Sequence, residues 1–363
     1  MYTASDLLPQ GPALSIDHLE TAWQAPSNIA LVKYWGKKEG QGPQIPANPS
    51  VSFTLSACQS QTRMQLRPRK AGEPLFQFMF EGQHQPSFEP KIADFFARIL
   101  PLCPYVDAYH WTIDSSNTFP HSSGIASSAS AMAALAACIV DLEQQLFAGM
   151  SPEIAQLKAS WLARLGSGSA CRSLQGPAVM WGQHAELGSN DYYGTPISFD
   201  LHPNFKDCRD SILLIETGQK QVSSTAGHGL MKNHPYASAR FEQAHRNLSN
   251  LLVQLQQGDW EGFIQLVESE ALTLHAMMMC SQPYYMLMRP NTLAALEAIT
   301  QFRRDTGLPL CFTLDAGANV HLLYAASADA AVKSFIADTL SAYCHEGQVL
   351  HDQLGQGAAK LYK

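Results

Sequence analysis

The hydrophobic pattern of the first 120 residues is typical of short β-strands. Apolar runs at 51–55, 64–66 and 75–80 are separated by stretches with Pro and Gly, and a run at 109–114 has the same character. A further apolar run at 179–183 follows a glycine-rich break. These runs predict a β-rich opening of the chain with another strand added later.

Between these runs, the apolar spacing changes to that of helices. Residues 91–100, 127–142 and 152–165 place apolar side chains three to four positions apart. The second of these segments follows a loop of Ser and Gly, and Pro152 stands where the third segment would begin its first turn. Helices and strands therefore share the first half of the chain.

A change of composition at 188–205 predicts a domain boundary near residue 195, because this stretch is rich in Gly, Pro, Asn and Tyr and has little periodicity. We expect an α+β protein with domains at 1–195 and 196–363. The second half contains an apolar run at 211–216, predicted helices at 234–257, 261–279 and 292–304, predicted strands at 311–314 and 320–324, and a predicted terminal helix at 328–344.

Composition narrows the choice of partners. The chain has 363 residues, 46% of them hydrophobic and 15% charged, with a formal net charge of -7. A net acidic chain argues against nucleic acid or an anionic membrane as partner, although a local cluster of positive groups can still bind a small anionic substrate. The low share of charged residues suits an oligomer interface, and we expect a homodimer.

Cysteines and apolar segments bear on location. The 8 cysteines are scattered without a CxxC pair or a Cys/His cluster at zinc spacing, which indicates reduced thiols in a cytosol. The N-terminal MYTASDLLPQ lacks a basic stretch followed by an apolar run, and no later segment is apolar for long enough to span a bilayer. We expect a cytoplasmic protein.

The first segment suited to chemistry is PHSSGIASSASAMAALAA at 120–137, a small-residue loop that leads into a helix. Small residues let the backbone approach an anion, and the N–H groups at a helix start bind phosphate without a basic side chain. No Walker loop is present, since neither GKS nor GKT occurs. Taken alone, the segment is explained equally well as a capped helix packed through Ala and Ser.

The second segment is APSNIALVKYWGKK at 25–38. Lys33 and Lys37 flank an aromatic pair beside a Gly turn, so cations and the Tyr34 hydroxyl come together as a polyanion would require. An amphipathic strand with surface lysines is the commoner explanation of such a cluster.

The third segment is GSGSACRS at 166–173. Ser167 and Ser169 supply hydroxyls in tight turns, and Arg172 offers a forked donor for a carboxylate or phosphate. A glycine-rich loop that merely ends a helix is the plainer interpretation of this string alone.

The fourth segment is TLDAGANVHLLY at 313–324, in which Asp315 stands between a strand and a Gly-Ala-Asn turn. A catalytic carboxylate is often presented at such a place, although any turn favours Asp there.

Together the four segments resemble the diphosphomevalonate decarboxylases, a family of the GHMP kinase superfamily. NIALVKYWGK is close to the family's N-terminal signature, GSGSACRS matches a family string, and DAGAN at 315–319 differs from the family's DAGPN-like motif by Ala318. The motifs occur in the family's order from residue 25 to 324, so the resemblance covers nearly the whole chain. The loop also fits the superfamily pattern PxxxGLxSSA, through Pro120, Gly124, Ile125, Ser127, Ser128 and Ala129.

This resemblance implies a GHMP kinase fold, with a ribosomal-S5-like N-terminal domain, a ferredoxin-like C-terminal domain and the active site in the cleft between them. It implies that ATP, with Mg²⁺, phosphorylates the 3-hydroxyl of mevalonate 5-diphosphate. Loss of phosphate and CO₂ would then give isopentenyl diphosphate.

The resemblance also implies roles for residues. Asp315 would act on the 3-hydroxyl with Lys33 beside it, and Arg172 would complete the catalytic set by positioning the substrate carboxylate. The implied substrate-binding residues are Tyr34, Lys37, Ser167, Ser169, Arg172 and Ser224. The implied nucleotide-binding residues are Pro120, Gly124, Ser127, Ser128 and Ala129, with Ser128 also as the magnesium ligand.

One position departs from the family in a way that charge can explain. Relatives commonly have Ser-Ser-Arg where this chain has Ser-Ser-Thr at 223–225, and threonine cannot supply the charge that arginine gives to a substrate phosphate. The second phosphate would be held by Lys220, His228, Lys232 or His121 instead, or would be absent from the substrate. The nearest alternative is therefore a mevalonate 5-phosphate decarboxylase. A mevalonate 3-kinase, a plain small-molecule kinase and a non-catalytic binding homologue are further alternatives, against which the retained Asp315, Lys33 and Arg172 argue.

Overall fold

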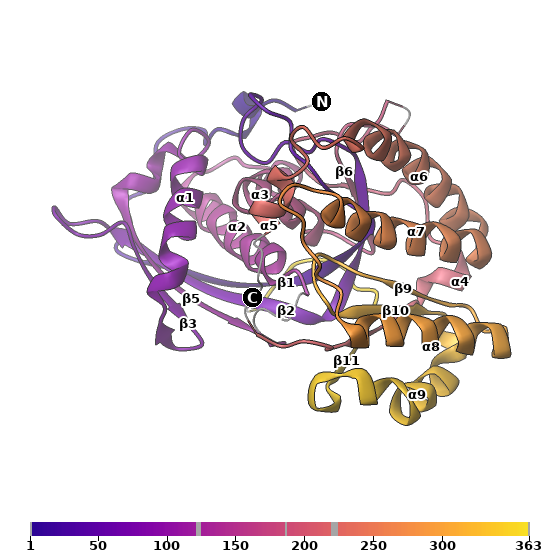
Figure 1. Cartoon of the computed structure of the whole chain (residues 1–363). Helices are drawn as coiled ribbons and strands as arrows, with labels where there is room; N and C mark the ends of the chain where they lie inside the picture. The colour runs from indigo at the N-terminus through magenta and orange to yellow at the C-terminus, as the bar shows by residue number, and fades with distance from the viewer. Residues whose placement is uncertain (1, 121–124, 186, 219–223, 362–363) are drawn as a thin grey trace.

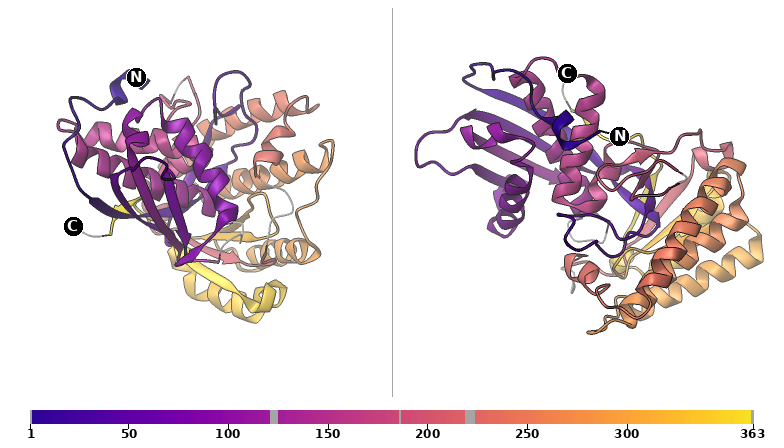
Figure 2. Two further views of the ribbon diagram at one scale, coloured as in Figure 1. Left: turned by 90° about the vertical axis from the view of Figure 1, so that its left-hand side faces the viewer. Right: turned by 90° about the horizontal axis from the view of Figure 1, so that it is seen from above.

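The computed structural model describes residues 2–120, 125–185, 187–218 and 224–361, without the side chains of 224–226. Two sheets, each covered by helices, form two halves of the molecule that lie side by side (Figures 1 and 2). The expected α+β fold is confirmed. Within the described ranges, no helix has the length and apolar character needed to cross a membrane.

The N-terminal sheet is built on two long antiparallel strands, β1 (Leu19–Val32) and β2 (Ser50–Pro68), with Ile29 opposite Phe53. Its strand order is β12-β1-β2-β5-β3-β4, with β6 paired to β2 and β7 paired to β6. The other strands are β3 (Phe76–Phe80), β4 (Gln83–His84), β5 (Tyr109–Asn117), β6 (Ala178–Trp181), β7 (Thr195–Pro196) and β12 (Ala359–Lys360).

Strand β2 corrects the prediction of separate strands at 51–55 and 64–66, which are parts of one continuous strand. Between them, Ser60 and Thr62 point inward and are buried. Their hydroxyls bond to other hydroxyls, of Ser130 at 2.7 Å and of Ser115 at 3.1 Å, respectively. The hydrophobic pattern is interrupted at these two polar residues, although the strand continues through them.

Three helices belong to the N-terminal half: α1 (Glu89–Ile99), α2 (Ser127–Leu146) and α3 (Pro152–Gly166). Helix α2 is buried along most of its length, because its Ala and Ser side chains allow close packing against β1 and β2. The Ser151 hydroxyl accepts the Ile154 N–H (3.2 Å), so α3 begins at Pro152 as predicted. All three helices were predicted to within a few residues.

The C-terminal half has a four-stranded antiparallel sheet in the order β11-β8-β10-β9. The predicted helices and strands of this half are found, apart from the terminal helix. The strands are β8 (Arg209–Leu213), β9 (Leu310–Thr313), β10 (Val320–Tyr324) and β11 (Val349–Gln353). The helices are α4 (Pro203–Lys206), α5 (Ser224–Gly229), α6 (Ala237–Gln257), α7 (Trp260–Met279), α8 (Pro290–Thr306) and α9 (Asp329–Asp338).

The prediction of a terminal helix at 328–344 is wrong in its second half. Helix α9 ends at Asp338, because Thr339 (φ -131°, ψ -57°) leaves the helical conformation, and a 3₁₀ turn follows at Leu340–Tyr343. Strands β11 and β12 were not predicted, and β12 returns to the N-terminal sheet beside β1. The division at residue 195 stays a prediction.

One side chain fastens the two sheets to each other. Asp352 on β11 accepts three main-chain N–H bonds from β2, from Ser56 (2.8 Å), Ala57 (2.8 Å) and Cys58 (2.7 Å). A carboxylate that accepts several N–H bonds makes a strong local contact. The two sheets are therefore held together through β2 and β11.

Candidate active site

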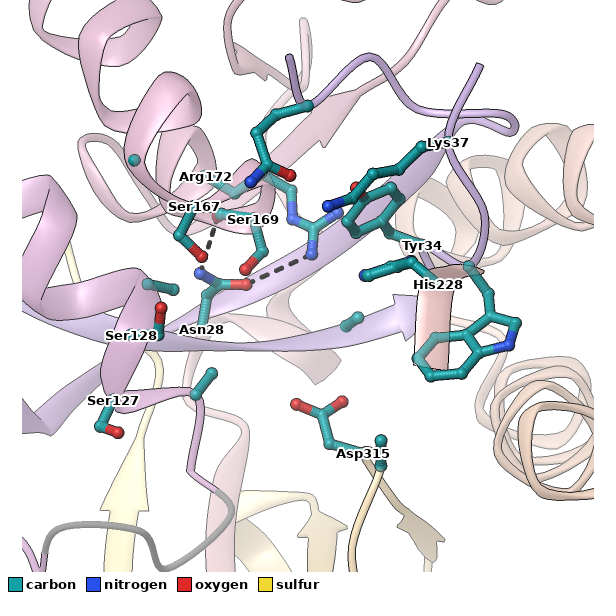
Figure 3. A pocket seen from close by; sticks show the side chains of 18 of the residues that line it. Asn28, Tyr34, Lys37, Ser127, Ser128, Ser167, Ser169, Arg172, His228 and Asp315 are labelled. Atoms are coloured by element: carbon teal, nitrogen blue, oxygen red, sulfur yellow. Dashed lines mark hydrogen bonds between the residues drawn. The ribbon is translucent and has the colours of Figure 1, made fainter. Parts of the chain in front are cut away.

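A cavity of about 670 Å³ opens between the two halves. It brings together residues from β1, α2, the 166–173 loop and the turn between β9 and β10 (Figure 3). Most of the predicted site residues line it: Lys33, Tyr34, Lys37, Ser127, Ser128, Ala129, Ser167, Ser169, Arg172 and Asp315. Segments far apart in the sequence therefore converge on one space.

Lys33 and Asp315 form an ion pair in the cavity wall. Lys33 Nζ lies 3.3 Å from Asp315 Oδ1 and also donates to the Ala30 carbonyl oxygen (2.5 Å). The Lys33 side chain is 2% exposed, whereas that of Asp315 is 28% exposed. Burial lowers the pKa of Lys33, and the Asp315 charge opposes this shift. The pair therefore offers a carboxylate to the cavity with a cation behind it.

A tight turn after β1 places Tyr34 and Lys37 at the same cavity. Gly36 has φ +101°, and an added Cβ would lie 3.1 Å from the Phe241 ring, so glycine suits this turn on both counts. The buried Tyr34 hydroxyl has no hydrogen-bond partner among the described residues. Because burial raises the pKa of Tyr34, its hydroxyl stays protonated and available as a donor.

Arg172 is buried beneath the loop that carries Ser167 and Ser169, in a 3₁₀ helix at Gly168–Ser173. One guanidinium nitrogen donates to the Ser50 hydroxyl, another lies 3.5 Å from Asn28 Oδ1, and Nε has no partner in the described chain. Burial lowers the pKa of Arg172, although an arginine of this kind stays charged near neutral pH. Its charge is therefore available to an anionic group in the cavity.

The start of α2 forms the opposite side of the cavity. Ala126 adopts a left-handed conformation (φ 45°, ψ 36°) immediately before Ser127, which turns the chain into the helix. The first N–H groups of a helix have no partner within it and carry its positive dipole end. Gly124 lies outside the described residues, and the described part of the lining does not include Pro120, which is exposed.

A second, apolar cavity of about 270 Å³ adjoins the start of α2 and shares Lys91, Ser127 and Ser128 with the first. Its apolar walls come from β3, the 3₁₀ turn at Pro86–Phe88, α1, β5 and α2. They include Phe78, Phe80, Phe88, Ile92, Ile113, Met132 and Leu135. Such a space suits a flat apolar group next to an anion.

Sequence reasoning assigned no role to Asn28, Gln44, Lys91 and Arg98, which also line the main cavity. Lys91 and Arg98 stand seven residues apart, which places them on one face of α1, and this spacing could have indicated a shared target. Lys91 donates to the Ser128 hydroxyl, and Arg98 donates to the Leu165 carbonyl oxygen (3.0 Å) just before the 166–173 loop.

The residues named as alternatives to an arginine at position 225 differ in whether they can supply positive charge to the cavity. His228 lines the cavity, but burial lowers its pKa to about 3, so it is neutral near pH 7. Its Nδ1 accepts the Gly36 N–H (3.0 Å). Lys232 is exposed and pairs with Glu39 (3.0 Å). Lys220 and His121 lie outside the described residues, as do the side chains of Ser224 and Thr225.

The charges of the cavity favour an anionic ligand. Among the described residues, five basic side chains line it (Lys33, Lys37, Lys91, Arg98 and Arg172), against the carboxylates Asp94 and Asp315. The described residues contain no group of three or more His, Cys, Asp or Glu side chains that could hold a metal ion. This fold and this cavity define an α+β protein of two halves with a basic cavity between them that suits a small anionic ligand.

Two family models match the chain. The diphosphomevalonate decarboxylase-like N-terminal domain matches residues 25–193, and the mevalonate 5-diphosphate decarboxylase C-terminal domain matches residues 211–359. The chain belongs to the diphosphomevalonate decarboxylase family, as its motifs predicted.

Similar proteins agree with this membership. The diphosphomevalonate decarboxylase of Eremothecium gossypii is 30% identical over 335 residues, which cover 88% of this chain and 81% of the relative. A crystal structure of a mevalonate diphosphate decarboxylase from Legionella pneumophila is 30% identical, with a TM-score of 0.75 over 92% of this chain and 100% of that one. A structure of MDDEF in complex with MVAPP, AMPPCP and magnesium has a TM-score of 0.81 at 26% identity, over 95% of this chain and 100% of that one.

Proposed function

We propose that this protein catalyses the ATP-dependent decarboxylation of mevalonate 5-diphosphate to isopentenyl diphosphate, with release of ADP, phosphate and CO₂. The observation that carries the proposal is the Lys33–Asp315 pair, which opens on a basic cavity beside the start of α2. Family membership and the complex of MDDEF with MVAPP, AMPPCP and magnesium support the same reaction.

The nucleotide is assigned to the α2 side of the cavity. The N–H groups at the start of α2 and the Lys91 ammonium suit the phosphates, and the adjoining apolar cavity suits the adenine ring. Ser128 would be the protein ligand of magnesium, which would neutralise charge on the phosphates of ATP. Magnesium-bound ATP supplies the phosphoryl group of the reaction.

The substrate is assigned to the β1 side. Tyr34, Lys37 and Arg98 would hold the diphosphate, because the Tyr34 hydroxyl is an unused donor and the other two are cations of the lining. Arg172 would hold the carboxylate, with its buried Nε as a further donor. The hydroxyls of Ser167, Ser169 and Ser224 complete the proposed substrate contacts.

Asp315 would orient the 3-hydroxyl of the substrate for attack on the γ-phosphorus. A tertiary alcohol is too weakly acidic for a carboxylate to deprotonate it fully first, but phosphoryl transfer has a loose transition state with little bonding to the nucleophile. Asp315 therefore takes the proton late. The Lys33 cation stabilises the Asp315 carboxylate and the charge that develops beside it.

Arg172 and its neighbours would then hold the phosphorylated intermediate while it fragments. The C3–O bond breaks with its electron pair going to the leaving phosphate, and the bond to the carboxylate breaks with its pair forming the new double bond, so that CO₂ leaves. Arg172 keeps the carboxylate aligned with the breaking C–O bond.

Mevalonate 5-phosphate is the second candidate substrate. Thr225 stands where the family resemblance implies an arginine. Among the alternatives named for that arginine's role, His228 is neutral and Lys232 is paired with Glu39. Lys37 and Arg98 then remain as the described cations at this end of the cavity. A monophosphate would need fewer cations.

Product analysis of the purified protein tests the reaction. With ATP and Mg²⁺, mevalonate 5-diphosphate is expected to yield ADP, phosphate and CO₂ in equal amounts. Turnover of the 5-phosphate alone would instead identify a monophosphate decarboxylase, and ADP without CO₂ would identify a 3-kinase. No turnover of either ester would indicate a binding homologue.

We also infer a cytoplasmic homodimer. All 8 cysteines are free thiols and seven are buried, as expected in a reducing compartment. Tyr236, Tyr284 and Met286 are large apolar side chains with more than half of their surface exposed, which suits an interface. Sedimentation equilibrium is expected to give twice the chain mass, and a monomer at micromolar concentration would contradict the dimer.

A further inference from the structure

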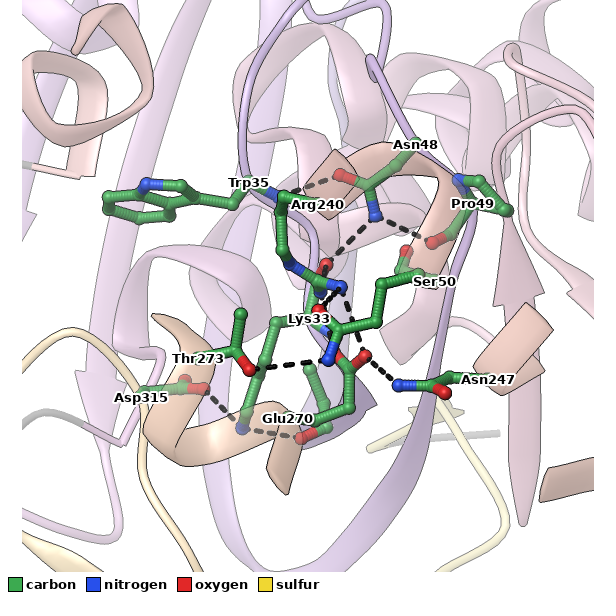
Figure 4. A network of polar contacts seen from close by, with 12 residues as sticks. Lys33, Trp35, Asn48, Pro49, Ser50, Arg240, Asn247, Glu270, Thr273 and Asp315 are labelled. Carbon is green, nitrogen blue, oxygen red and sulfur yellow. Dashed lines mark hydrogen bonds and ion pairs between the residues drawn. The ribbon is translucent and has the colours of Figure 1, made fainter. Parts of the chain in front are cut away.

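Helix α7 touches the main chain of both members of the catalytic pair. Glu270 on α7 accepts the Lys33 N–H at Oε2 (2.9 Å), as Figure 4 shows. Five residues further along the helix, His275 Nε2 lies 3.1 Å from the Asp315 carbonyl oxygen. Lys33 and Asp315 are 282 residues apart in the sequence, yet one helix holds both backbones.

The Lys33 peptide is held at its carbonyl as well. Arg240 Nη2 donates to the Lys33 carbonyl oxygen (3.1 Å), and Asn48 Nδ2 donates to the same oxygen (2.9 Å). Arg240 also pairs with Glu270 through two bonds of 3.0 and 2.5 Å, and Asn247 adds a third donor to Glu270 (2.6 Å). Each Glu270 oxygen thus accepts two hydrogen bonds.

These contacts are rigid because they are buried and the helix is packed on several sides. Glu270 is 0%, His275 1% and Arg240 2% exposed. Helix α7 packs into three separate apolar clusters. Its contributions to them are Phe263 and Val267 in the first, Ala271 in the second, and Leu274, Met277 and Met278 in the third. A close-packed helix transmits its position to whatever it holds.

We propose that α7 sets the separation of the Lys33 ammonium and the Asp315 carboxylate by holding their main chains, with Glu270, Arg240 and His275 as positioning residues. The described cavity lining contains none of these three side chains. The inference rests on the proposed function, which assigns catalysis to the Lys33–Asp315 pair.

A change in the Lys33–Asp315 separation should alter the pH dependence of kcat, which a loss of folding stability alone would not do. The charged or titratable groups that interact with Lys33 are Asp315, Glu270, Arg172, His275 and Asp210. Burial lowers the pKa of Lys33 and Asp315 opposes this, so moving Asp315 away lowers the Lys33 pKa further. If protonated Lys33 is the active form, the alkaline limb of kcat moves to lower pH. Partial unfolding reduces the amplitude of the profile but does not move its limb.

His275 offers the sharpest test because amides can replace its two nitrogens separately. Burial lowers the pKa of His275 to about 4, so near pH 7 the neutral ring can donate Nε2–H to the Asp315 carbonyl. His275→Gln places an amide nitrogen close to Nε2, whereas His275→Asn places it close to Nδ1. The matched control is Thr273→Ala, also on α7, which removes the hydroxyl that accepts a hydrogen bond from Gln243 on α6 (3.3 Å).

His275→Asn is expected to lower kcat by about ten-fold to a hundred-fold, with both KM values nearly unchanged and the alkaline limb at lower pH. His275→Gln should recover most of kcat and the normal limb, and Thr273→Ala should match the wild type. Glu270→Gln should move the limb in the same direction, measured on the folded fraction. Equal losses in both His275 variants, or an unmoved limb in His275→Asn, would overturn the proposal.

Asp315→Asn in the same assay separates this inference from the proposed function. If Asp315→Asn retains activity, the assigned role of the pair is wrong. If Asp315→Asn is inactive while His275→Asn behaves as wild type, the pair is catalytic but α7 does not set it.

Discussion

The molecule contains two lysine–carboxylate pairs in which the lysine is buried. One is Lys158–Glu143 in the N-terminal core, and the other is Lys33–Asp315 in the cavity wall. The two carboxylates differ in access, because the Glu143 side chain is 0% exposed and that of Asp315 is 28% exposed. The pairs also differ in length, at 2.5 Å for Lys158–Glu143 and 3.3 Å for Lys33–Asp315.

The core pair is enclosed by its own partners. Lys158 also donates to the Leu102 carbonyl oxygen (3.0 Å), and Glu143 accepts the Tyr105 hydroxyl (2.9 Å). Burial raises the pKa of Glu143, against the effect of Lys158. A buried lysine with a shifted carboxyl therefore does not by itself mark an active site. What distinguishes Asp315 is that the cavity reaches it.

The largest expected effect is that of removing the Asp315 carboxylate. Asp315→Asn is expected to lower kcat by about 10³-fold or more, because the amide keeps the shape but cannot accept the hydroxyl proton. Steady-state kinetics should show an ATP KM within a few-fold of wild type. Glu143→Gln, which removes the carboxylate of the core pair, should leave kcat per folded molecule unchanged. Near-normal turnover of Asp315→Asn would remove this residue from the mechanism.

The core pair should matter for stability instead. Lys158→Met leaves the Glu143 carboxyl buried without its cation, so the free energy of unfolding should fall by about 3–5 kcal/mol. Urea denaturation measures this loss, and kcat per folded molecule should stay within about two-fold because the pair does not reach the cavity. A large fall in kcat without loss of stability would contradict a purely structural role of the Lys158–Glu143 pair.

Substrate binding in the cavity is expected to depend on positive charge near the substrate phosphates. Thr225→Arg adds one such charge. If the substrate is the diphosphate, this arginine should tighten its binding by about 1.5–3 kcal/mol, the magnitude of a charge-assisted hydrogen bond. Thr225→Gln, of similar reach but without charge, is the control. Comparison of KM for both mevalonate esters tests this, and equal tightening of the two would contradict a contact with the terminal phosphate.

The smallest expected effect is in the pH profile. Because burial lowers the pKa of Lys33, its proton should be lost below the ordinary lysine pKa of about 10.4, so kcat should fall as pH rises through that lowered value. Where Lys33→Arg retains measurable activity, its alkaline limb should be flatter, since arginine stays charged. A limb unchanged in Lys33→Arg would assign it to another group, such as Lys37, whose pKa burial also lowers.

Local patterns predicted much of the fold. Alanine spacing marked α2, and Pro152 marked the start of α3. The hydrophobic pattern could not join the two parts of β2, where Ser60 and Thr62 are buried through hydroxyl contacts. It also extended α9 beyond Asp338 and missed β11 and β12, whose pairing depends on strands far away in the sequence.

The candidate site was predictable where motifs carry it. Three of the four segments contain Lys33, Arg172 and Asp315, which the structure brings to one cavity. The residues that hold the Lys33 main chain were not predictable. Glu270 and Arg240 contact it from helices that lie 237 and 207 residues further along the chain, respectively. Nothing in the local sequence of α6 or α7 marks a side chain that will hold a distant peptide group.

The fate of the substrate's 3-hydroxyl oxygen distinguishes phosphorylation of the substrate from hydrolysis of ATP by water. In the proposed reaction, Asp315 directs this hydroxyl onto the γ-phosphorus, and its oxygen later leaves with the phosphate. With mevalonate 5-diphosphate carrying ¹⁸O in the 3-hydroxyl, mass spectrometry of the released phosphate should find one ¹⁸O atom for each CO₂ formed. Unlabelled phosphate together with CO₂ would show that ATP is cleaved by water, and would contradict the account.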